Sequence, residues 1–400
     1  MWGYLKIELS KFFTNKKNIA VYVLLLSFAV FYAIRIAPAY DPIEKVDINQ
    51  IEANYLTREE FLIQREGKDS SSSHPAVQYA MSIFPLWNEI ELKRMEALQK
   101  KDLKEYTLTT SEWYLFTDSQ TFGGGYYYYN PRYYTFGNND AHMEGHLAYL
   151  ATASKYAKYA EFKNQELSLE VLEEFTAIQT LYRLMDDYLP YVLLVACLLL
   201  SVDVVLQDRK HPTLLRGYPI HDWKKLITKG ITAFIGSLAI FVPLLIGYII
   251  IGIQFGFGSF KFPVAIRLAD NPHGFETITM AKYFALTGTL LLAWFIVIIS
   301  FVLLLSVILR NEIANLIGGL MLVFAEFYYL DKGYGYFKPV QDYLPTYTQV
   351  SHVVTNSKNY FYEASGIDFP KGLLLLSISA VILIILSVVI TLSKRYRFIR

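Results

Sequence analysis

The chain has 400 residues, of which 54% are apolar and 18% are charged, and it contains one cysteine, Cys197. Its long apolar runs exclude an ordinary soluble protein, and the single cysteine excludes a disulfide within the chain. The net charge of +1 hides a segregation, because residues 37–187 carry 14 Lys/Arg against 24 Asp/Glu and the remainder carries 23 against 12. This asymmetry is typical of a membrane protein with one large extracellular domain.

The first 17 residues predict a helix that lies on the membrane surface. Its apolar side chains recur at helical spacing, whereas Lys6, Glu8 and Lys11 fall on the opposite face. An apolar face with a basic rim is typical of an interfacial helix. The predicted interfacial anchors are Trp2, Leu5, Leu9, Phe12 and Phe13. The alternative is a plain basic flank that orients the first span, or the start of a signal peptide.

The apolar runs predict six membrane-spanning helices in an all-α polytopic protein, each long enough to cross a hydrocarbon core of about 30 Å. The predicted spans are residues 18–36, 188–206, 230–253, 282–308, 313–329 and 372–393. The short segments on one side are basic, including the tail 394–400, so both termini are expected in the cytoplasm. Residues 330–371 are expected outside, as is the linker from Phe255 to Pro272.

Residues 37–187 form the expected extracellular domain, and its apolar periodicity predicts mostly helix. One helix is predicted through Val77 to Leu98, with a kink or break at Pro85. A second is predicted to begin at an Asp140 N-cap and to reach Tyr159. A third is predicted to run from Ser168 directly toward the second span.

Two motifs in this domain suggest chemistry. Tyr126, Tyr127, Tyr128 and Tyr129 follow three glycines and offer rigid contact surface for a substrate or interface; the alternative is a loop that packs on its own domain. His142 and His146 are four residues apart, so they share a helix face and are weak candidates for a metal site. A metalloprotease motif needs Glu directly after the first His, which this sequence lacks, and no metal is expected.

Two acidic residues in predicted spans are expected to form ion pairs rather than a proton relay. Asp203 lies near the inner end of the second span, where Arg209 or Lys210 is the expected partner. Glu326 lies near the outer end of the fifth span, where Arg35 is the expected partner. Cys197 is expected to be a small, buried packing residue.

Residues 207–229 form a predicted cytoplasmic loop that contains six basic and two acidic residues. Its centre is also apolar and aromatic, which a simple connection between two helices does not require. Apolar side chains in a charged loop favour a surface that docks on a soluble partner. The residues that carry this prediction are Asp208, Thr213, Leu214, Leu215, Tyr218, Pro219, Ile220, Trp223 and Lys225.

This segment resembles the coupling helix of ABC transporter permeases of the type-2 exporter class, and residues 1–17 resemble the elbow helix of the same family. The resemblance rests on an acidic residue, Thr-Leu-Leu, Pro-Ile and a Lys between the second and third spans. Two features depart from the family pattern: Pro212 stands where Gly is usual, and His221-Asp222 replaces a small-polar and Arg pair.

The resemblance implies a permease subunit of an ATP-driven exporter in a bacterial cell membrane. It further implies a separate ABC ATPase in two copies, which would carry the ATP and Mg, and a second permease chain, identical or homologous. No GxxxxGK[ST] motif is present, so the chain itself is expected neither to hydrolyse ATP nor to bind a cofactor. No nucleic-acid partner is expected.

The expected substrate is hydrophobic or amphipathic: a peptide, a lipid or a drug, with antimicrobial peptide export or immunity as one candidate because the acidic domain would attract cations. Two alternatives remain from other classes. One is a non-transporting membrane sensor or scaffold with an extracellular receptor domain. The other is a membrane-embedded metal-dependent enzyme that uses His142, Glu144 and His146.

Overall fold

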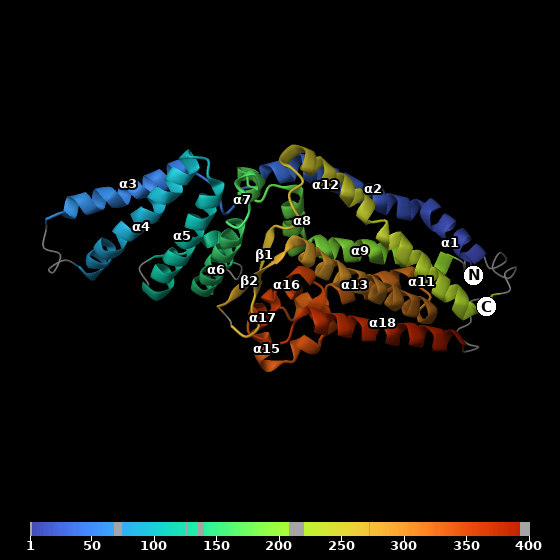
Figure 1. The fold of residues 1–400 in the computed structure, drawn as a ribbon. Coiled ribbons are helices and arrows are strands. Elements are labelled where there is room, and N and C mark those ends of the chain that lie inside the picture. The colour runs from blue at the N-terminus through green and yellow to red at the C-terminus, as the bar shows by residue number, and fades with distance from the viewer. Residues whose placement is uncertain are drawn as a thin grey trace. The chain divides into compact units, whose positions relative to one another are not determined.

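The computed structural model describes residues 2–67, 74–124, 127–134, 140–207, 220–271 and 273–392. The chain divides into two compact units (Figure 1). The membrane unit comprises Met1–Ala39, Ala177–Phe257 and Lys282–Arg400, and the helical unit comprises Tyr40–Thr176 and Gly258–Ala281. The chain is mostly helical, as the apolar periodicity predicts.

The membrane unit is an assembly of apolar helices. Its helices are α1 (Trp2–Thr14), α2 (Lys16–Phe31), α8 (Ala177–Asp186), α9 (Leu189–Ser201), α11 (Asp222–Leu238), α12 (Phe241–Phe255), α13 (Met280–Ile308), α14 (Glu312–Val323), α15 (Tyr334–Phe337), α16 (Val350–Val354), α17 (Ser357–Tyr362) and α18 (Phe369–Leu392). Four continuous helical segments are long and apolar enough to cross a membrane: Lys16–Ala39, Asp222–Phe255, Met280–Ile308 and Phe369–Leu392. These segments are compatible with a membrane protein.

Two further segments of the membrane unit are apolar but shorter or bent. The chain bends sharply between α8 and α9, and α14 is only 12 residues long. Pro190 follows directly on Leu189 at the start of α9 and disfavours helix in the residue before it. The predicted single helix from Ser168 into the second span is therefore wrong, since it is divided into α7 (Leu169–Leu172), α8 and α9.

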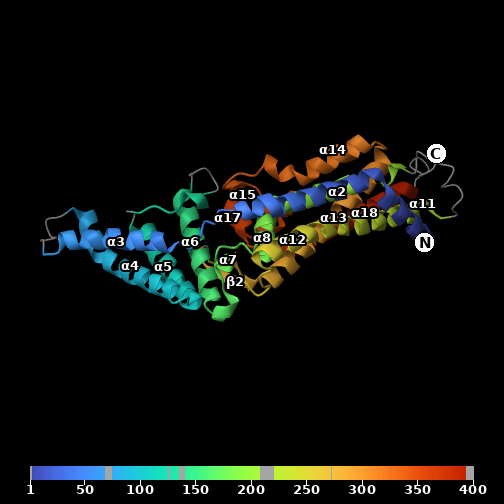
Figure 2. The same cartoon turned by 90° about the horizontal axis from the view of Figure 1, so that it is seen from above.

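The core of the membrane unit lies on α9 and α13, whose side chains are buried on several faces. Cys197 is fully buried there, as expected for a packing residue. Trp294 of α13 is also fully buried, and its indole Nε1 donates a hydrogen bond to the Tyr347 carbonyl at 2.8 Å. Helices α2 and α12 pack side by side (Figures 1 and 2).

The helical unit stacks its long helices against their neighbours in sequence, α3 on α4, α4 on α5 and α5 on α6. Its elements are α3 (Ile48–Arg65), α4 (Pro75–Gln99), α5 (Leu103–Gly124), α6 (Ala141–Tyr159), α7, β1 (Pro263–Arg267) and β2 (Phe275–Thr279). Asp140 is the N-cap residue of α6, as predicted. Helix α4 continues through Pro85, so there is no break, and the alternative of a kink stays a prediction.

A β-hairpin in the helical unit is the one departure from the all-α prediction among the described residues. Strands β1 and β2 pair antiparallel, with Val264 opposite Ile278. Both of these side chains are buried, and the hairpin packs on α6. Strand β1 lies within Phe255 to Pro272, which was expected to be a linker, because a single strand of five residues carries little periodic signal.

Candidate functional site: an ionic cluster beside the basic loop

Helix α1 is docked on the membrane unit through one narrow face. Tyr4, Glu8 and Phe12 recur every four residues and are all buried. The predicted anchors divide: Phe12 is buried, Leu5 and Leu9 are partly buried, and Trp2 and Phe13 are exposed. The placement of Glu8 on a solvated face was wrong, since only 4% of this residue is exposed.

Phe12 sits directly against Gly236 of α11. A Cβ atom added at Gly236 would lie 2.0 Å from Phe12 Cε1, so α1 and α11 approach closely only because this residue is glycine. Tyr22 of α2 also donates a hydrogen bond to the Gly236 carbonyl at 2.8 Å. Helices α1, α2 and α11 therefore meet at one point.

The buried Glu8 carboxylate has a buried cation as its partner. Lys229 of α11 is 1% exposed, and its Nζ lies 2.8 Å from Glu8 Oε2 and donates to the Val204 carbonyl at 2.8 Å. Helix α1, helix α11 and the turn that follows α9 are thus joined through one ammonium group. A charge this deeply buried is stable only when it is paired and hydrogen-bonded.

A second ion pair lies on the same segments, between Lys17 of α2 and Asp203 after α9. Asn15 and Gln207 donate further hydrogen bonds to Asp203 Oδ2 at 3.3 and 2.7 Å. An ion pair at Asp203 was predicted, but with Arg209 or Lys210, which lie outside the described residues. We refer to Glu8, Lys17, Asp203 and Lys229 as the N-terminal ionic cluster.

Most of the predicted docking segment lies in the sequence between Asp203 and the start of α11. Asp208, Thr213, Leu214, Leu215, Tyr218 and Pro219 lie outside the described residues. Ile220 lies two residues before α11, whose N-cap is His221, and Trp223 and Lys225 lie in its first turn. Lys225 is 2% exposed and faces Asp222 at 3.8 Å, so its charge is largely taken up within the chain.

Glu326 forms a second buried site in the membrane unit. It is 1% exposed and forms an ion pair with Lys358 of α17, which is 2% exposed. Tyr362 and Tyr191 donate hydrogen bonds to Glu326 Oε1 and Oε2 at 2.9 and 3.3 Å. The predicted partner was Arg35, and the actual partner comes from the segment that precedes α18.

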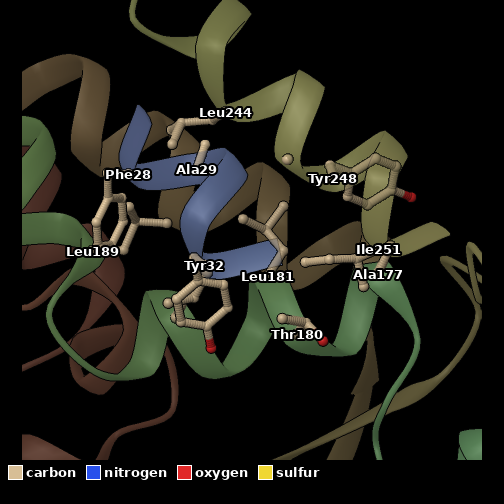
Figure 3. A pocket seen from close by; sticks show the side chains of 12 residues that line it. Phe28, Ala29, Tyr32, Ala177, Thr180, Leu181, Leu189, Leu244, Tyr248 and Ile251 are labelled. Carbon is tan, nitrogen blue, oxygen red and sulfur yellow. The ribbon is translucent and has the colours of Figure 1, made fainter. Parts of the chain in front are cut away.

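An apolar pocket separates α2, α8 and α12 near the end of α2 (Figure 3). Its lining includes Ala29 of α2, Tyr32 directly after α2, Leu181 of α8, and Tyr248 and Ile251 of α12. The pocket volume is ≈ 40 Å³, well below the roughly 150 Å³ of an apolar cavity that binds benzene.

The four predicted contact tyrosines of the helical unit separate in the structure. Tyr129 is buried and donates a hydrogen bond to Asp118 Oδ1 at 2.7 Å, and Tyr127 packs edge-on against Trp87. Tyr128 is 95% exposed, and Tyr126 lies outside the described residues. Of the described three, Tyr128 alone presents most of its ring for contact.

The two candidate metal ligands, His142 and His146, lie in different environments. His146 is buried between Asp118, 2.8 Å from its Nδ1, and His273, 2.9 Å from its Nε2. His142 is exposed, and both rings stack on Phe122. Within the described ranges no three His, Cys, Asp or Glu side chains are arranged to hold a metal ion. His273, on the hairpin, was not identified from the sequence.

Glu44 of the helical unit is a buried carboxyl group with an unusual environment. Its Oε1 atom is buried and has no hydrogen-bond partner. Burial is the largest cause that raises the pKa of Glu44 to about 7, and the Glu174 carboxylate adds to it while the Lys155 ammonium opposes it. The nearby Lys155 is ion-paired with Glu174 at 2.6 Å.

This pKa predicts that acid stabilises the helical unit. A folded-state pKa above the unfolded value near 4.3 contributes stability that is complete at low pH and is lost as the pH rises through about 7. We expect the free energy of opening, measured by hydrogen exchange of the full chain, to fall by up to about 3 kcal/mol from pH 5 to pH 8.

The control for this pH prediction is Glu44→Gln, which cannot titrate. Hydrogen exchange in peptides that cover Glu44, Thr152 and Lys155, corrected for the intrinsic pH dependence of exchange, should lose this slope in the variant. An unchanged slope would assign the pH dependence to other groups.

Comparison with known proteins identifies no relative: no family model, curated protein or solved structure matches the chain.

Proposed function

We propose that the chain is the permease subunit of an ATP-driven exporter that resembles the type-2 ABC class, and that a separate ATPase docks on residues 207–229. The observation that supports this most directly is the Glu8–Lys229 ion pair. It fastens the N-terminal helix to the helix that follows the basic loop. A movement of the docked ATPase against residues 207–229 would therefore displace α1 and α11 together.

Two further contacts connect α2 to its neighbours. Lys17 and Asp203 join the start of α2 to the end of α9, and Tyr22 joins α2 to Gly236. The loop is thus flanked on both sides by segments held to the first two helices. In a complex of two permease chains and two ATPase subunits, these linked helices would transmit the movement of the ATPases and open a pathway for a hydrophobic or amphipathic substrate. A bacterial cell membrane is the proposed location.

The test is a pull-down of the full chain expressed together with its neighbouring genes, in which an ABC ATPase should co-purify. Trp223→Ala and Pro219→Asp should each abolish recovery of the ATPase, because both remove apolar contacts of the docking segment. Tyr128→Ala, which removes a 95% exposed ring in the helical unit, should leave recovery unchanged. Recovery of no ATPase with the wild-type chain would contradict the proposal and favour the sensor or scaffold alternative.

A further inference from the structure

An apolar groove on the membrane unit lies among three helices. It is lined by the first half of α11, the second half of α13 and the second half of α18, and has a volume of ≈ 260 Å³. An engineered apolar cavity of roughly 150 Å³ binds benzene, so this groove has room for a longer hydrocarbon. The lining residues are Leu226, Ile227, Gly230, Ile231, Phe234, Ile296, Ile299, Ser300, Leu303, Ile384, Ser387 and Val388.

The groove is partly open to the surface and apolar on its walls. Each of the three helices contributes one isoleucine that is about 40% exposed: Ile231 at 40%, Ile296 at 39% and Ile384 at 38%. Ser387 turns its hydroxyl to the Leu383 carbonyl at 2.7 Å, so it offers no free donor to the groove. Such walls do not retain water, and they match a hydrocarbon chain.

One end of the groove is basic. Lys224 precedes Ile227 and Ile231 by three and seven residues on α11, so it shares their face. Its Nζ lies over the ring of the preceding residue, Trp223, at 5.3 Å, on the N-terminal side of the groove-lining residues of α11. Arg310, which is exposed, lies seven residues after Leu303, the last groove-lining residue of α13, and two residues beyond the end of that helix. A hydrocarbon chain in the groove would therefore carry its polar end to two cations.

We propose that this groove binds one acyl chain of an anionic phospholipid, with the phosphate group at Lys224 and Arg310. The inference is independent of the proposed transport function, since it rests on the groove and its flanking charges. Basic residues near a membrane surface favour anionic lipids by about 1 kcal/mol each. A zwitterionic lipid would fill the same groove without this gain.

The test is native mass spectrometry of the full chain from micelles that contain equal amounts of palmitoyl-oleoyl phosphatidylglycerol and phosphatidylcholine. We expect retained lipid with a preference for phosphatidylglycerol. Lys224→Gln should lower that preference about fivefold, whereas Lys16→Gln, at an exposed lysine that opens α2, should not. Circular dichroism and gel filtration check the fold of each variant.

A second pair of variants separates the groove from general lipid contact. Ile231→Trp fills the groove and should abolish retention of the lipid. Ile249→Trp is the control and should leave retention unchanged, because Ile249 of α12 is 41% exposed and lies outside the groove. Equal retention by both variants would overturn the proposal. A wild-type chain without a preference for phosphatidylglycerol would also overturn it. So would a dimer that Ile231→Trp dissociates, because the groove would then be the interface with a second copy of the chain.

Discussion

Glu91→Ala should destabilise the helical unit by about 3–5 kcal/mol, because it leaves two arginines without their shared carboxylate. Glu91 is fully buried. Its Oε1 accepts from Arg58 at 3.3 Å and from Trp113 Nε1 at 2.9 Å, and its Oε2 lies 2.8 Å from Arg94. One carboxylate therefore links α3, α4 and α5.

The arginines would not find water easily after this change. Arg58 lies over the Trp87 ring at 4.7 Å, and Arg94 lies over the Trp113 ring at 5.0 Å. These cation–π contacts hold both guanidinium groups against aromatic surface. Breaking a buried ion pair by removing one partner is costly for this reason, because the remaining charge stays desolvated.

The measurement for Glu91 is hydrogen exchange of α3, α4 and α5 peptides in the full-length protein. Glu89→Ala is the matched control, since Glu89 lies on the same helix and pairs with Lys93 at 2.8 Å on the exposed surface. We expect lost protection with Glu91→Ala and unchanged protection with Glu89→Ala. Equal effects of the two variants would show that the buried network does not hold the three helices together.

Lys229→Met should release α1 from α11, because Glu8 would remain in a buried site without its buried cation. The expected cost is again about 3–5 kcal/mol for the docked arrangement. Exchange of the α1 amides and cleavage near Thr14 by a protease should both increase. Lys11→Ala is the control, because Lys11 contacts the same carboxylate at 3.5 Å but is 46% exposed.

Gly236→Ala tests the same docking without altering a charge. Its added methyl group would overlap the Phe12 ring, so α1 should also loosen while the Glu8–Lys229 pair keeps both of its partners. If α1 stays protected in both variants, the N-terminal ionic cluster does not hold it. In the proposed exporter, both variants should retain the ATPase on co-purification but lose substrate-stimulated ATP hydrolysis.

The sequence by itself predicted the features that depend on local pattern. Hydropathy over some 20 residues identifies apolar helices wherever they occur, and four such helical segments are present. The start of α6 at Asp140 was also predicted, because a capping residue and the periodicity behind it lie in one short window. The six-span topology and the docking role of residues 207–229 remain predictions.

Tertiary structure alone decided which charged groups meet. Glu8 and Lys229 are 221 residues apart, and Glu326 selects Lys358 over Arg35 although both are basic. No periodicity within either segment encodes such a choice, since it depends on how the helices pack around each buried carboxylate. Lys229 and Asp203 each lie at the edge of an apolar run, and this position was the one feature of the sequence that marked them as candidates for ion pairs. Only long-range packing revealed their partners.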